Sequence, residues 1–83
     1  MHKIVFFGLS TCGWCKKMKR LLDSSELQYE LVYVDKLQGE EKRQATEQVK
    51  RWNPRVSFPT VVIDDARAII GYRETEIREV LDL

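Results

Sequence analysis

The sequence predicts an α/β fold in which a four-stranded mixed sheet is flanked by three helices, all within one domain spanning residues 1–83. Two observations predict it. Short apolar runs alternate with segments of helical periodicity in the order βαβ, then α, ββ and α. Near the C-terminus, two apolar runs are separated only by Asp64-Asp65, as in a hairpin. A right-handed βαβ crossover and a closing hairpin together give parallel and antiparallel strands in one sheet.

The N-terminal quarter predicts a strand and then a helix. Lys3–Gly8 is apolar and rich in β-branched and aromatic residues, which is typical of a buried strand. A helix is expected over Gly13–Asp23, with Ser10 and Thr11 as its candidate caps and Asp23-Ser24-Ser25 as its stop. The residues that recur at helical spacing in it are Trp14, Met18, Leu21 and Leu22.

The middle of the chain predicts a second strand and a second helix. Gln28–Val34 alternates between apolar and polar residues, which indicates a strand. Glu40–Trp52 begins with acids and ends with Lys50-Arg51, which suits the helix dipole, and Asn53-Pro54 ends it. Its predicted apolar face consists of Ala45, Val49 and Trp52.

The C-terminal third predicts the hairpin and a last helix. Thr60–Ile63 and Arg67–Ile70 are the two strands, joined by a turn at Asp64-Asp65. Gly71 ends the second of them. Glu74–Leu81 then has helical periodicity, with Ile77, Val80 and Leu81 expected to face inward.

Composition narrows the function classes. The 83 residues contain 14 Lys and Arg against 13 Asp and Glu, which argues against an electrostatic binder of nucleic acid or membrane. The apolar run after Met1-His2-Lys3 is too short for a signal peptide or a membrane span. We therefore expect a cytoplasmic protein.

Cys12-Gly13-Trp14-Cys15 contains the only two cysteines and predicts a redox site. The motif lies where the first strand passes into the first helix, whose terminal N–H groups and partial positive charge stabilise a thiolate. Thiols so placed have a pKa of roughly 3.5–7.5 instead of about 8.5. Zinc is the competing interpretation, but a structural zinc site needs four ligands and His2 is the sole further candidate.

The chain resembles the glutaredoxin family of the thioredoxin fold along essentially its whole length. The resemblance is carried by the element order, by the CxxC motif after the first strand, and by Ser57-Phe58-Pro59-Thr60 before the third. It implies that Cys12 is the exposed nucleophile and Cys15 the resolving thiol. It also implies a cis peptide bond before Pro59, with this proline against the cysteine pair.

Three departures from that family leave the electron donor open. Leu9 and Ser10 stand where glutaredoxins commonly have Lys and Pro, and the usual Gly-Gly followed by Asp is replaced by Gly71-Tyr72-Arg73-Glu74-Thr75. This last segment is similar to the Gly-Phe-Arg-Pro-Asp of redoxins that serve ribonucleotide reductase and are reduced by thioredoxin reductase. Those proteins, however, have Val-Gln between the cysteines. Either a thioredoxin-reductase-like protein or glutathione as a co-substrate is therefore expected, with no tightly bound cofactor.

Several residues around the motif are candidate substrate contacts. Trp14 is interpreted either as an exposed docking surface or as a residue packed over the motif, and Arg73 either as a partner contact or as the ion-pair partner of Glu76. The basic run Lys16–Arg20 is either a solvated helix face or a source of positive potential that attracts acidic partners. The predicted substrate-binding residues are Gly13, Trp14, Phe58, Pro59, Gly71, Tyr72 and Arg73.

These features together predict a monomeric dithiol–disulfide oxidoreductase that reduces disulfides of partner proteins through Cys12 and Cys15. The alternative is a module of the glutaredoxin type that binds or delivers an iron–sulfur cluster or a metal, with a cluster shared between two chains through Cys12.

Overall fold

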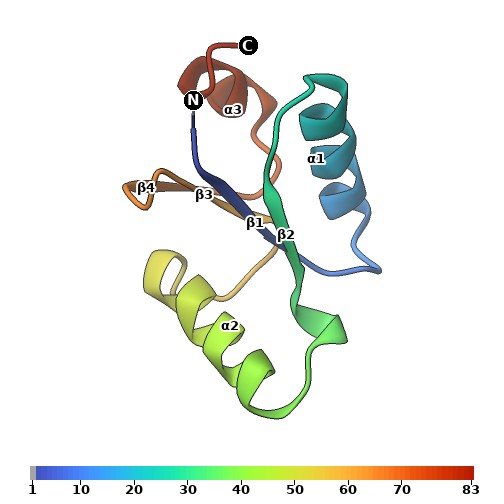
Figure 1. Cartoon of the computed structure of the whole chain (residues 1–83), viewed down its shortest axis with the longest axis vertical. Coiled ribbons are helices and arrows are strands. Elements are labelled where there is room, and N and C mark those ends of the chain that lie inside the picture. The colour runs from blue at the N-terminus through green and yellow to red at the C-terminus, as the bar shows by residue number, and fades with distance from the viewer. Residues whose placement is uncertain (1) are drawn as a thin grey trace.

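The computed structural model describes residues 2–83 as one mixed sheet with helices on both faces (Figure 1). The strand order is β2-β1-β3-β4. Helices α1 and α3 lie over one face and α2 over the other (Figure 1). None of the helices within residues 2–83 is long and apolar enough to cross a membrane. The elements are β1 (Ile4–Gly8), α1 (Gly13–Ser24), β2 (Glu30–Tyr33), η1 (a 3-10 turn, Val34–Lys36), α2 (Gly39–Trp52), β3 (Thr60–Ile63), β4 (Arg67–Ile70) and α3 (Glu74–Val80).

The pairing of the strands confirms the predicted fold class. Phe6 in β1 pairs with Leu31 of β2 in parallel and with Val61 of β3 in antiparallel orientation. Val61 in turn pairs with Ile69 across the β3–β4 hairpin. Because β1 and β3 are the central strands and are covered on both faces, their residues are the near-continuous apolar runs of the sequence.

Alternation along the central strands creates two cores. Phe6 faces α1 and α3, whereas its neighbour Phe7 faces α2, because successive side chains of a strand point to opposite faces. Trp52, predicted to be in the core, is only half-buried against the α2 side. Cys15 belongs to the core on the face that α1 and α3 cover, and Cys12 packs against the same core.

The second strand is shorter than predicted. β2 covers Glu30–Tyr33, not Gln28–Val34, and Val34 begins the 3-10 turn η1 that the sequence did not reveal. β2 is an edge strand, and within residues 2–83 it pairs with β1 alone; their pairing ends where β1 ends, at Gly8 with Tyr33. Val34 is buried against α2, so its apolar character reflects this packing and not a longer strand.

The cap at the start of α1 differs from expectation, whereas the helix ends within the predicted stop at Asp23-Ser24-Ser25. Cys12 is the N-cap, not Ser10 or Thr11, and its side chain accepts a hydrogen bond from the first turn. At the other end Glu26 adopts a positive φ of 57°. The Leu27 N–H donates to the Leu22 carbonyl and the Glu26 N–H to that of Asp23, which is a Schellman ending usually completed by glycine.

Candidate active site

Cys12 lies at the junction of a short loop with the start of α1. Its thiol accepts a hydrogen bond from the Cys15 N–H at 3.3 Å, and its own N–H donates to the Leu9 carbonyl at 3.1 Å. The residue is half-buried, so part of it is exposed to solvent. The sulfur of Cys12 therefore lies at the start of the helix and faces a backbone N–H.

Cys15 has the opposite environment. Its side chain is only 2% exposed and belongs to the core that contains Phe6 and Met18. Burial, and next a hydrogen bond with Cys12, raise the pKa of the Cys15 thiol to about 12. At neutral pH the pair therefore contains one approachable sulfur and one protonated, inaccessible thiol behind it.

Gly8, which the sequence analysis did not single out, provides the space for Cys15. A Cβ atom at this position would lie 3.0 Å from Phe6 Cε1 and 3.3 Å from Cys15 Sγ. Such contacts are too close for a normal packed core. Glycine at the end of β1 therefore lets α1 bring the buried thiol against the strand.

Asp35 is a second residue that the sequence analysis missed. Its carboxylate accepts hydrogen bonds from both the N–H (2.9 Å) and the hydroxyl of Ser10, so it fastens the loop that leads to Cys12. The Ser10 hydroxyl and then the Ser10 N–H lower the pKa of Asp35. Because β1 and β2 are parallel, the segments that follow them meet at one edge of the sheet, and this rule is the signal that could have revealed the pair.

The segment before β3 forms the opposite wall of the site. The Phe58–Pro59 peptide bond is cis, and Phe58 makes no backbone hydrogen bond to any described residue. Asn53, interpreted from the sequence only as the end of a helix, is buried. Its amide donates to the Ser57 hydroxyl at 2.8 Å and to Thr60 Oγ1 at 3.2 Å. Asn53 therefore positions the loop that contains Phe58 and Pro59.

Five of the predicted contact residues line one shallow depression, which we call the active-site groove: Trp14, Phe58, Pro59, Gly71 and Tyr72. The indole of Trp14 is exposed and stacks on the Tyr72 ring, with their centroids 5.7 Å apart. Of the two interpretations of Trp14, the structure supports the exposed surface. The prediction that Trp14 belongs to the buried apolar face of α1 is therefore wrong.

Gly13 and Arg73 lie outside the active-site groove. Gly13 is exposed, with open space around it. The Arg73 guanidinium donates to the Ile70 carbonyl at 3.2 Å, and within residues 2–83 it forms no ion pair with Glu76. Its Nε therefore holds the turn between β4 and α3.

The βαβ-αββα arrangement with a dithiol at the start of the first helix defines a redox protein of the thioredoxin fold. A family model described as Glutaredoxin matches residues 4–67. The chain belongs to the glutaredoxin family, whose members are thiol–disulfide oxidoreductases.

Individual relatives support the same assignment. Glutaredoxin 1 of Rickettsia prowazekii is 32% identical over 65 residues, which cover 78% of this chain and 65% of the relative. The crystal structure of Methanosarcina acetivorans methanoredoxin is 53% identical, with a TM-score of 0.94 over 98% of this chain and 85% of that one. The glutaredoxin of Methanosarcina mazei Go1 is 48% identical, with a TM-score of 0.91 over 100% and 87% of the two chains. The chain thus spans slightly less than two thirds of the rickettsial protein.

Proposed function

We propose that this protein is a dithiol–disulfide oxidoreductase that reduces protein or mixed disulfides through Cys12 and Cys15. The observation that carries the proposal is the unequal exposure of the two sulfurs: Cys12 is half-buried at the helix start and Cys15 is buried behind it. This asymmetry determines which sulfur meets the substrate first.

In the first step, the Cys12 thiolate attacks one sulfur of the substrate disulfide. A bond forms between Cys12 Sγ and that sulfur, the substrate S–S bond breaks, and the other substrate sulfur leaves as a thiolate that takes up a proton. The Cys15 N–H, which already points at Cys12 Sγ, stabilises the attacking thiolate.

In the second step, Cys15 releases the substrate. Its thiol loses a proton, its sulfur attacks Cys12 Sγ, and the remaining substrate sulfur departs and is protonated. The products are two substrate thiols and a Cys12–Cys15 disulfide, a transfer of two electrons and two protons. Because burial raises the pKa of Cys15, its thiol stays protonated until its sulfur attacks Cys12 Sγ, and the proton it gives up is balanced by the one that the departing substrate sulfur takes up.

A donor must then reduce the Cys12–Cys15 disulfide, and we propose a thioredoxin-reductase-like protein ahead of glutathione. Leu9 packs against the α2-side core and supplies no cation beside Cys12. The Glu74 carboxylate near the start of α3 is not free for glutathione, because it already accepts hydrogen bonds from Arg78 at 2.9 Å and from the Tyr72 hydroxyl at 3.1 Å. Efficient turnover of hydroxyethyl disulfide with glutathione, glutathione reductase and NADPH would reverse this preference.

The proposed activity is tested by reduction of insulin with dithiothreitol. We expect the wild-type protein to accelerate insulin reduction and the Cys12→Ser variant to fall to the rate without protein. Acceleration that survives in Cys12→Ser would refute the proposal. We further propose that the protein acts as a cytoplasmic monomer on disulfide-containing proteins, which sedimentation of the reduced protein and localisation of the tagged chain would check.

The iron–sulfur alternative rests on the family resemblance. Within residues 2–83, no three His, Cys, Asp or Glu residues are grouped to hold a metal ion. A cluster shared between two chains stays a prediction, which visible absorption and dimerisation after reconstitution would test.

A further inference from the structure

A second groove lies between α1 and α3, next to the active-site groove. We call it the basic groove. Tyr72 lines both grooves, so the two adjoin the same side chain. The basic groove is lined by Lys17, Arg20, Leu21, Ser24, Tyr72, Glu74 and Arg78.

The basic groove has an excess of positive charge. It contains Lys17, Arg20 and Arg78 against the single acid Glu74, and that acid is bound to Arg78 at 2.9 Å. Among the ion pairs formed within residues 2–83, none includes Lys17 or Arg20. Two exposed cations of one helix face are therefore available for an anionic partner.

Lys17 connects this charge to the exposed aromatic surface. Its ammonium lies 4.8 Å from the centroid of the Trp14 ring, and the other partner of Trp14 is Tyr72. A cation over an aromatic ring is attracted to its face, which favours a position of Lys17 on the active-site side of the groove. A substrate polypeptide that extends from the active-site groove along α1 would thus contact the aromatic surface first and the cations next.

We propose that the basic groove binds an acidic segment of the oxidised substrate protein, adjacent to the cysteine that Cys12 attacks. This inference rests on the proposed function and specifies its substrate class. Lys17 and Arg20 follow Cys12 by about 7.5 Å and 12 Å along the helix axis, at 1.5 Å per residue. An extended segment advances about 3.3 Å per residue, so the acids lie about two to four residues from the reacting cysteine.

The test uses peptide disulfides, which need no electron donor. One peptide carries Glu at the second, third and fourth positions on both sides of a single cysteine, and the matched peptide carries Gln there. Each cysteine is joined to thionitrobenzoate as a mixed disulfide. Attack on the peptide sulfur releases the coloured thiol, Cys15 then frees the peptide, and the second-order rate constant is measured in a single turnover of the reduced protein.

The variant is Lys17→Gln/Arg20→Gln, and the control is Lys50→Gln/Arg51→Gln, which removes the same charge at the end of α2, on the other face of the sheet. The quantity compared is the ratio of the rates on the Glu and Gln peptides, because any change in the reactivity of Cys12 affects both rates equally. Arg20→Gln alone is a second, milder variant.

At low ionic strength we expect the wild-type protein and the control to prefer the Glu peptide about tenfold, the size of effect that two exposed charge pairs provide. The double variant is expected to lose the preference to within about twofold, and Arg20→Gln to retain about threefold. At about 0.15 M salt the wild-type preference shrinks, because charges are then screened over about 8 Å.

A wild-type ratio near one, or the same ratio in the double variant as in the wild type, would overturn the basic groove as a docking site. Failure of the proposed function looks different, since neither peptide would then release the coloured thiol faster with the wild-type protein than with Cys12→Ser.

Discussion

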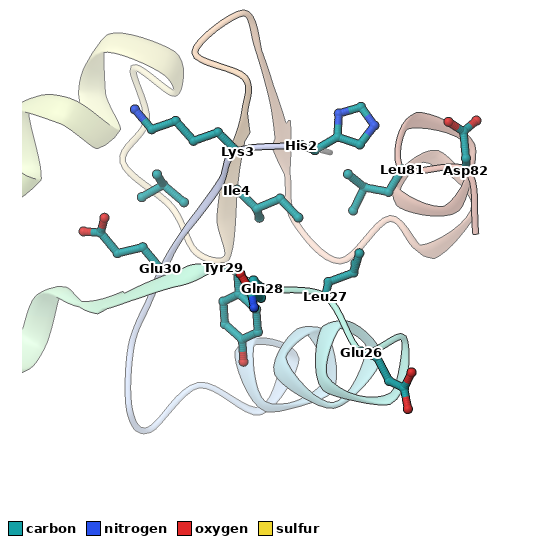
Figure 2. Close-up of a pocket in the computed structure, with 11 residues that line it drawn as sticks. His2, Lys3, Ile4, Glu26, Leu27, Gln28, Tyr29, Glu30, Leu81 and Asp82 are labelled. Atoms are coloured by element: carbon teal, nitrogen blue, oxygen red, sulfur yellow. The ribbon is translucent and has the colours of Figure 1, made fainter.

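The two ends of strand β1 lead to surface depressions of very different character. At its C-terminal end, beyond Gly8, lie the cysteines and the active-site groove of about 230 Å³. At its N-terminal end lies a pocket of about 790 Å³. Figure 2 shows Ile4, Leu27 and Leu81 facing one another in this far pocket, with Glu26 pointing away from it.

The difference shows that chemistry, and not volume, identifies the site. At the far pocket, His2 Nδ1 lies 2.7 Å from the Asp64 carboxylate and Lys3 Nζ lies 2.9 Å from the Asp65 carboxylate. These basic side chains therefore already have partners within the protein. The smaller groove at the other end is lined by the exposed indole of Trp14 and by Tyr72. It lies beside the start of α1, which carries Cys12, and beside Lys17 and Arg20 of the basic groove, and these are the groups a disulfide substrate needs.

Replacement of the resolving thiol at the reactive end is expected to have the largest effect. The Cys15→Ser variant should accumulate a stable mixed disulfide between Cys12 and substrate, because no second sulfur is present to release it. Mass spectrometry without reductant measures the adduct. Lys3→Gln, at the far pocket, is the control and should release its substrate as the wild type does. Normal multiple turnover by Cys15→Ser would contradict the role of Cys15.

The two thiols should differ strongly in alkylation. At pH 7 we expect iodoacetamide to label Cys12 at least about 100-fold faster than Cys15, because Cys15 is buried and its pKa is raised to about 12. Peptide mapping of the reduced protein with time measures both rates. In denaturant the two rates should become equal, and equal labelling in the native protein would show that the asymmetry is absent.

Gly8→Ala tests the packing that brings Cys15 against β1. The added methyl group would meet Phe6 and Cys15 at 3.0 Å and 3.3 Å, so we expect the free energy of unfolding to fall by about 1–3 kcal/mol. Urea denaturation of the reduced protein measures it. Gly13→Ala is the matched control, since a Cβ there meets nothing within 4 Å, and it should cost no stability. Equal effects of the two substitutions would contradict the close approach at Gly8.

Substitutions of Asp35 and Asp64 test whether the carboxylates at the two ends of β1 differ in importance. Asp35→Asn should slow disulfide reduction about threefold to tenfold, because it weakens the anchor of the loop before Cys12. Asp64→Asn loses the partner of His2 at the far pocket and should leave the rate unchanged. Equal rates in the two variants would show that Asp35 does not position Cys12.

The pH dependence of stability distinguishes positioning by the Asp35 charge from a general loss of structure. Ser10 lowers the pKa of Asp35 in the folded protein, so the stabilisation is present above the unfolded value of about 3.9 and is lost as the pH falls through the folded pKa. Urea denaturation at a series of pH values should therefore show the wild type and Asp35→Asn converging below about pH 4.

The smallest effect is expected beside the far pocket, at the end of α1. Glu26→Gly should raise the free energy of unfolding by about 0.5–1 kcal/mol, because glycine adopts the positive φ of 57° without the steric cost that a side chain carries. Thermal denaturation measures it, and the insulin assay should be unchanged. A loss of stability would contradict the Schellman geometry.

The sequence predicted well the features that depend on neighbours along the chain. The Asp64-Asp65 turn is one example: both residues have positive φ values, of 56° and 50°, as a type I′ turn requires, and Ala66 completes the loop between the paired Ile63 and Arg67. The dithiol at the start of α1 is another, since its position follows from the end of one apolar run and the beginning of the next. The family resemblance added the cis bond before Pro59 and five residues that the structure gathers into one groove.

The features that the sequence did not reveal depend on contacts between distant segments. Ser10 and Asp35 are 25 residues apart, and only the parallel pairing of β1 and β2 brings them together. Asn53 shows no sign in the sequence of its bonds to Ser57 and Thr60, because its position before a proline already explains it as a helix end. Val34 was assigned to a strand since apolar character alone does not distinguish pairing from burial.

By itself, the sequence determined the element order, the alternation that builds two cores, and the presence of two thiols one helical turn apart, because these follow from local periodicity and spacing. The family resemblance had implied that Cys12 is the exposed member of the pair. Only the tertiary structure decided that Cys15 is buried among Phe6 and Met18, that Gly8 makes room for it, and that Lys17 and Arg20 lie in a groove with Arg78. Burial and surface charge are properties of what surrounds a residue, and in this fold the surroundings come from helices and strands far apart in the chain.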